Sequence, residues 1–107
     1  MLPDENSMPT GDCFEAAGKF ISQPAVVDYP DDYLLVHGNV AKLRQDEPVN
    51  HAWIEERDLV HEVSGGRREV FSKKTYYEHH GITNVRTYTV EQALLLLARE
   101  GHWGPWN

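Results

Sequence analysis

The chain has 107 residues, 40% of them hydrophobic and 25% charged, which fits one globular domain with a single core. Its formal net charge of −7 argues against nucleic acid or an anionic membrane as a partner, because both attract basic surfaces. The single cysteine excludes an internal disulfide, and no apolar run approaches the ~20 residues of a membrane span. Since the first residues lack a signal pattern, we expect a cytoplasmic protein.

Hydrophobic periodicity and turn residues predict one domain. Residues 1–10 are polar and contain proline, so we expect a flexible arm before a single domain over 11–107. In chain order, the expected elements are a helix over 13–22, a strand over 33–41, a hairpin of 49–56 against 58–64, a helix over 71–80, a strand over 84–88 and a helix over 89–100.

Capping residues support the three expected helices. Asp12 precedes the first helix and Ser72 lies in the first residues of the second, and both residue types are favoured at N-caps. Thr89 opens the last helix with the spacing of a capping box, and Gly81 and Gly101 follow helix ends. The expected fold class is therefore α+β: an N-terminal helix carrying the cysteine, packed on a small antiparallel sheet, with two further helices.

The first candidate functional residue is Cys13, which falls at the predicted start of a helix. Backbone N–H groups are unpaired at a helix start, and the helix dipole makes that end positive. A thiolate is stabilised there, especially beside a histidine, and the same N–H groups can bind an oxyanion. Free cysteines are also common in cores, so a buried structural thiol is the alternative.

The second candidate is His51, on the first strand of the predicted hairpin. Alternation places His51, Trp53 and Glu55 on one face of that strand. If the hairpin turns at residues 56–57, His51 lies directly opposite Glu62, close enough for the carboxylate to orient the imidazole.

These positions predict a nucleophile, a base and an orienting acid. His51 would take the proton of Cys13 and later protonate the leaving group, while Glu62 would fix the tautomer of the ring. A one-residue slip of register would move Glu62 to the other face. Asp58 would then replace it as the acid, with Glu55 as a less favoured substitute.

The motifs around these residues resemble the papain-like cysteine peptidase superfamily, most closely its transglutaminase-like branch. The matching segments are Gly11–Ala17 at a helix start, His51–Glu55 on a strand and Val60–Ser64 after it. The resemblance implies a minimal papain-like or transglutaminase-like core that acts on the amide bond of a peptide or protein through a thioester. The usual third member in that family is Asp or Asn, whereas this chain offers Glu62.

The resemblance also suggests where a substrate would lie. Asn6 is the nearest upstream amide that could serve an oxyanion hole, although papain-type enzymes use a glutamine. Trp53 and Trp103 are candidate substrate contacts, the latter in an aromatic C-terminal segment. The oligomeric state is left open.

Two other histidines fit the core, and the sequence contains no metal-binding motif. His37 and His61 alternate with apolar neighbours, which predicts hydrogen-bonded core histidines. We expect no metal and no cofactor, because the chain lacks His-x-x-x-His and paired-cysteine spacings.

A non-catalytic protein-binding module on the same scaffold is the alternative function, and it predicts a buried or unreactive Cys13.

Overall fold

The computed structural model of the chain describes residues 12–41 and 49–106, so the expected arm over residues 1–10 lies outside the described part. The helices are α2 (Cys13–Ile21), α3 (Pro24–Val27), α4 (Lys73–His80) and α5 (Val90–Glu100). The strands are β1 (Tyr33–Val40), β2 (Val49–Glu56), β3 (Leu59–Glu62), β4 (Glu69–Ser72) and β5 (Ile82–Thr89). Two short 3-10 helices complete the described elements, η1 (Pro30–Asp32) and η2 (Ser64–Gly66).

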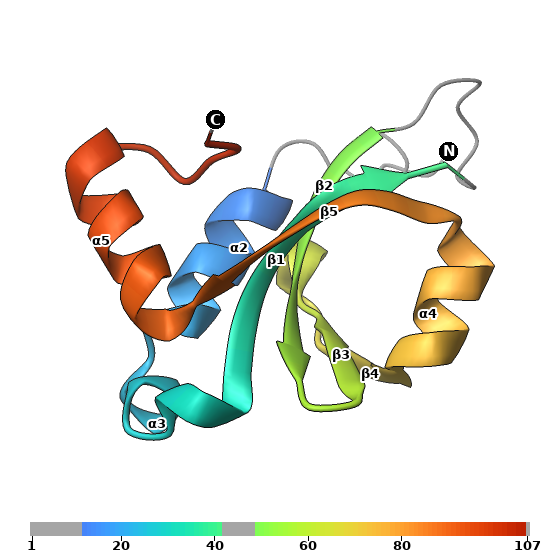
Figure 1. Cartoon of the computed structure of the whole chain (residues 1–107), viewed down its shortest axis with the longest axis horizontal. Helices are drawn as coiled ribbons and strands as arrows, with labels where there is room; N and C mark the ends of the chain where they lie inside the picture. The colour runs from blue at the N-terminus through green and yellow to red at the C-terminus, as the bar shows by residue number, and fades with distance from the viewer. Residues whose placement is uncertain (1–11, 42–48, 107) are drawn as a thin grey trace.

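The five strands form one antiparallel sheet in the order β4-β3-β2-β1-β5. Helices α2, α3 and α5 lie on one side of this sheet and α4 on the other (Figure 1). The expected α+β class, with the N-terminal helix carrying Cys13, is confirmed.

The predicted helix caps are largely confirmed. Ser72 accepts a hydrogen bond from the N–H of Thr75, and Thr89 forms a full capping box with Gln92. Gly81 and Gly101 end their helices in the left-handed conformation that glycine adopts without strain.

Two elements differ from the expectation. Glu69–Ser72 forms strand β4, although the sequence predicted that a helix begins at residue 71. The pairing of β4 with β3 overrides the local pattern, and α4 begins only at Lys73. Helix α3 occupies Pro24–Val27, where no regular element was expected.

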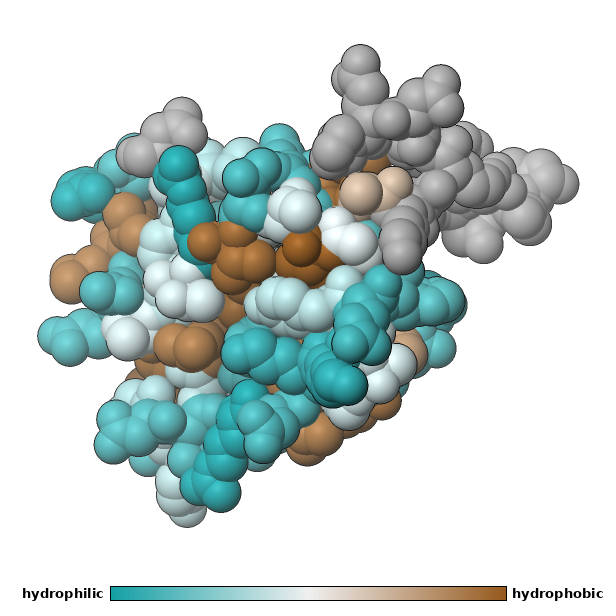
Figure 2. Space-filling view, turned by 45° about the vertical axis from the view of Figure 1, so that its right-hand side comes forward, coloured by the Kyte–Doolittle hydropathy of each residue, from teal (hydrophilic) through white to brown (hydrophobic). Residues whose placement is uncertain are grey.

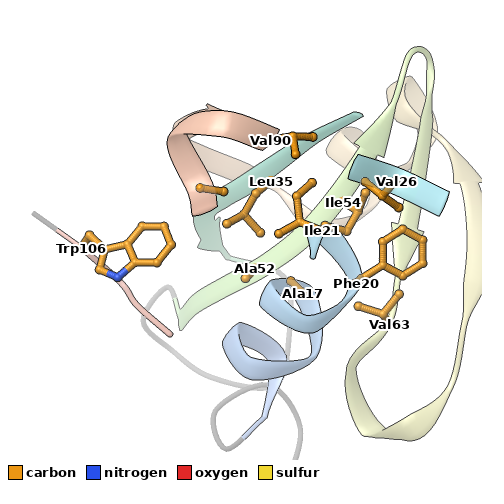
Figure 3. Close-up of a cluster of buried hydrophobic side chains, with 11 residues drawn as sticks. Ala17, Phe20, Ile21, Val26, Leu35, Ala52, Ile54, Val63, Val90 and Trp106 are labelled. Atoms are coloured by element: carbon orange, nitrogen blue, oxygen red, sulfur yellow. The ribbon is translucent and has the colours of Figure 1, made fainter. Parts of the chain in front are cut away.

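Each face of the sheet has its own apolar cluster, because side chains alternate along the strands. The larger cluster joins α2, α3 and α5 to the sheet, and Figure 3 shows Leu35, Ala52 and Ile54 pointing toward Ile21. The smaller cluster lies on the α4 side and consists of Val36, Trp53, Val60 and Tyr76.

The surface of the protein carries both hydrophobic and hydrophilic side chains. Hydrophobic side chains are interspersed with hydrophilic ones on the face shown in Figure 2. The large hydrophobic residues with exposed surface are Tyr29, Leu59, Val70, Val85, Leu95 and Trp103. In the described part of the chain, no helix has the length and apolar character needed to cross a membrane.

Candidate functional site

Cys13 is the first residue of α2, and its side chain has no exposed surface. Asp12 occupies the N-cap position, and its backbone oxygen accepts the first helical hydrogen bond from Ala16 at 2.7 Å. The N–H groups of Cys13, Phe14 and Glu15 precede that bond, so the helix itself supplies no acceptor for them. Cys13 therefore lies at the positive end of the helix.

Asp12 does not cap the helix with its side chain, which corrects one part of the N-cap expectation. Its carboxylate oxygens instead accept the N–H of Gly65 in η2, at 3.2 and 3.3 Å. This bond ties the start of α2 to the segment that directly follows β3.

The tie explains how a helix on one side of the sheet reaches a histidine on the other. The ladder between β2 and β3 runs from Glu56–Leu59 to Ile54–His61, and no further pair extends it. Helix α2 contacts both β2 and η2, and its N-cap residue Asp12 is bonded to Gly65 of η2. The start of α2 therefore lies beyond the last residue pair of β2 and β3. Cys13 is thereby brought to the ring of His51.

His51 and Glu62 are in direct contact, with Nε2 of the imidazole 2.8 Å from Oε1 of the carboxylate. An ionised carboxylate only accepts hydrogen bonds, so Nε2 carries the proton and donates it. Both side chains are largely buried. The pair that alternation predicted is present.

The predicted register of this hairpin was wrong by two residues. The turn lies at Arg57 and Asp58, so Glu55 pairs with Val60 and not with Asp58. Arg57 adopts a positive φ of 56°, and its guanidinium donates to Asp32 at 2.9 Å. A shift of two residues leaves every side chain on its predicted face, and Glu62 reaches His51 diagonally.

Two hydroxyl groups complete the surroundings of Glu62. The Tyr76 hydroxyl donates to Oε1, the oxygen that also binds His51, at 2.5 Å. The Ser64 hydroxyl donates to Oε2 at 2.7 Å. Glu62 therefore accepts three hydrogen bonds from side chains that belong to β2, η2 and α4.

The pKa values of the pair move in the directions that an ion pair requires. Burial works to lower the pKa of His51, but the interactions with Cys13 and Glu62 outweigh it and raise the pKa to about 9. Burial works to raise the pKa of Glu62, but His51, Tyr76 and Ser64 together lower it to about 2. At neutral pH the site thus holds an imidazolium against a carboxylate.

The other ring nitrogen of His51 is available to the thiol. Nδ1 is buried and has no hydrogen-bond partner among the described residues. The Cys13 thiol is nevertheless close enough to act as a hydrogen-bond and charge partner that raises the pKa of the ring. Cys13 and His51 are therefore neighbours that interact without forming a hydrogen bond that meets geometric criteria.

The two alternative acids have other partners. Glu55 is buried and accepts hydrogen bonds from Trp53 and Tyr77, with the Lys73 ammonium 3.3 Å from its other oxygen. Asp58 lies in the hairpin turn, where its backbone oxygen accepts the N–H of Lys73. Neither replaces Glu62 as the partner of His51.

The candidate substrate contacts lie in different places. Trp53 is fully buried, with its ring 5.8 Å from that of His51, so it supports the imidazole and has no surface for a substrate. Trp103 packs over Gly18, more than one turn along α2 from Cys13. Asn6 lies outside the described residues.

Two further histidines are buried on the opposite face of the sheet. His61 is hydrogen-bonded as predicted, with Nε2 2.9 Å from Oε1 of Glu56. His37 is also in the core, but the prediction that it is hydrogen-bonded was wrong, because neither ring nitrogen has a partner among the described residues. Aromatic rings surround it instead: Phe14 at 4.8 Å, Trp106 at 5.0 Å and Tyr88 at 5.1 Å.

The sequence did not reveal Tyr76 and Ser64 as neighbours of the site. Tyr76 belongs to a helix with little apolar periodicity, so no local pattern indicated which face of the sheet it covers.

The residues that the structure describes include no group of three or more His, Cys, Asp or Glu side chains that could hold a metal ion.

Comparison of the chain with protein family models, with curated proteins and with solved structures gives no match.

Proposed function

We propose that the protein is a small cysteine-dependent enzyme that acts on an amide or peptide bond through a thioester. The observation that carries this proposal is the arrangement around His51. Its Nε2 is bound to Glu62, and its ring interacts with Cys13 at the start of α2. A nucleophile, a base and an orienting acid in this order are the parts of a catalytic triad.

Each step of the proposed reaction uses one of these groups. The Cys13 thiolate attacks the carbonyl carbon, and the negative charge that develops on the carbonyl oxygen faces the N–H groups at the start of α2. The His51 imidazolium then donates its proton to the leaving amine as the carbon–nitrogen bond breaks, which leaves a thioester on Cys13. His51, now neutral, takes a proton from water or from an acceptor amine, which attacks the thioester and releases the thiolate.

The charge on His51 gives this reaction an upper pH limit. Its pKa of about 9 means that the imidazolium is present throughout the neutral range. We expect turnover of an amide substrate to fall as the pH rises through about 9, because the leaving amine then lacks its proton donor. A rate that keeps rising above pH 10 would contradict a proton donor at His51.

Alkylation of Cys13 tests the proposal without knowledge of the substrate. The iodoacetamide labelling rate at pH 6.5 should fall at least ~10-fold in His51→Ala, because the thiolate loses the cation that stabilises it. His61→Ala is the matched control, since His61 is also buried and bonded to a glutamate, but on the other face of the sheet. Circular dichroism should establish that both variants are folded. An unchanged rate in folded His51→Ala would rule out the proposed triad.

The full burial of Cys13 favours a second candidate function, a non-catalytic protein-binding module on the same scaffold. In that case the native thiol would label far more slowly than in the unfolded chain, and His51→Ala would not change its rate. Light scattering would also detect a concentration-dependent complex. A monomer with a thiol that labels rapidly at pH 6.5 would rule out this candidate.

A further inference from the structure

Helix α4 places one buried tyrosine against the acid of the site. Tyr76 is 2% exposed, and its ring packs 5.5 Å from that of Trp53 and 5.6 Å from that of Phe71. This packing holds the hydroxyl 2.5 Å from Oε1 of Glu62, the same oxygen that accepts from His51. The orientation of the carboxylate therefore depends on α4 as well as on β3.

We propose that Tyr76 is a positioning residue, which fixes the Glu62 carboxylate so that this carboxylate can fix the imidazole of His51. The inference rests on the proposed cysteine-dependent function. With Tyr76 on Oε1 and Ser64 on Oε2, the carboxylate cannot rotate away from the ring without losing hydrogen bonds. A buried tyrosine hydroxyl without an acceptor is costly, so the contact is kept when the site is at rest.

The neighbouring tyrosine provides a matched control. Tyr77 follows Tyr76 in the same helix, and its hydroxyl donates to a different buried carboxylate, that of Glu55. Glu55 also accepts the indole N–H of Trp53 and pairs with Lys73. Loss of either tyrosine hydroxyl thus removes one bond between α4 and the sheet, but only Tyr76 acts on the partner of His51.

The experiment compares Tyr76→Phe with Tyr77→Phe in the full chain. The first readout is the iodoacetamide labelling rate of Cys13 at pH 7, and the second is the imidazole Nε2–H signal of His51 in a ¹⁵N-histidine-labelled sample. We expect Tyr76→Phe to slow labelling about 10-fold and to make the Nε2–H proton exchange with water about 10-fold faster. Tyr77→Phe should leave both within twofold of the wild type.

Each outcome separates this inference from the proposed function. If His51→Ala slows labelling but folded Tyr76→Phe does not, the proposed function stands and the role of Tyr76 is refuted. If His51→Ala also leaves labelling unchanged, the proposed function fails and this inference fails with it. Equal effects in Tyr76→Phe and Tyr77→Phe would show that α4 only stabilises the fold.

A second variant covers the case in which Tyr76→Phe does not fold. Ser64→Ala removes the donor from the other oxygen of Glu62 at a half-buried position. We expect it to change both readouts in the same direction as Tyr76→Phe. Unchanged readouts in folded Ser64→Ala would overturn the proposed anchoring of the carboxylate.

Discussion

The histidines of this protein show how the same side chain acquires opposite properties from its neighbours. His51 is buried beside a carboxylate and a thiol, and its pKa is raised to about 9. His37 is buried among aromatic rings without a hydrogen-bond partner in the described part of the chain, and its pKa is lowered to about 4 by burial and by the charge of Arg86. The first is charged at neutral pH and the second is neutral.

The neutral state of His37 predicts acid sensitivity. The unfolded chain binds a proton at this residue near pH 6.5, whereas the native protein does so only near pH 4. The free energy of unfolding should therefore be unaffected by His37 above pH 6.5 and should fall as the pH drops from 6.5 to 4. The loss should reach about 2 kcal/mol at pH 5.

Urea unfolding at pH 7 and pH 5 measures this effect. His37→Phe keeps an aromatic ring in the same position but cannot bind a proton, so its stability should change much less between the two pH values. A His37→Phe variant that loses as much stability as the wild type between the two pH values would show that His37 does not titrate in this range.

Strands β1 and β2 leave no room for a side chain at Gly38, next to His51. Gly38 of β1 pairs with His51 of β2, and a Cβ atom at Gly38 would lie 2.8 Å from the Trp53 ring and 3.3 Å from the backbone oxygen of Thr83. Because Trp53 is fully buried, its ring has little room to move. A side chain at residue 38 must therefore disturb the support of His51.

Gly38→Ala should destabilise the protein by about 1–3 kcal/mol, the usual cost of overpacking a core. Thr87→Ala, at an exposed position of β5, is the control and should change stability by less than about 0.5 kcal/mol. Thermal unfolding followed by circular dichroism measures both. A Gly38→Ala variant as stable as the wild type would mean that the Trp53 ring repacks freely.

At the scale of single elements, the sequence predicted best those features that depend on residues close together in the chain. The caps at Ser72 and Thr89 and the start of α2 follow from residue types within one helical turn. The hairpin turn could not be predicted, because Arg57 has no glycine-like preference and its positive φ is accompanied by a distant contact to Asp32. The His51–Glu62 pair was nevertheless predicted correctly, since the register error was an even number of residues.

At the scale of the whole molecule, apolar packing dominates one side of the sheet, whereas polar contacts add to a smaller apolar cluster on the α4 side. Helices α2, α3 and α5 contribute to the larger apolar cluster (Figure 3), whereas Tyr76 is the one buried residue of α4. The hydroxyls of Tyr76 and Tyr77 and the ammonium of Lys73 attach α4 to buried carboxylates. Such long-range polar docking leaves no periodic pattern, which is why the sequence did not place α4 at the site.

This asymmetry predicts unequal local stability. Segments with few buried apolar contacts open first, so amides of α4 should exchange with solvent at least ~10-fold faster than those in the middle of α2. Native-state hydrogen exchange followed by NMR measures the two helices in one sample. Equal protection of both helices would mean that α4 unfolds only together with the core.

The lack of exposed surface at Cys13 also affects how fast its sulfur is oxidised. Thiolates oxidise to sulfenic acid and then irreversibly to sulfinic and sulfonic acids, and susceptibility follows both thiolate character and exposure. A sulfur enclosed at the start of α2 is screened from peroxide in the folded protein. The burial that limits the access of any reagent to Cys13 thus also slows the oxidation of its sulfur.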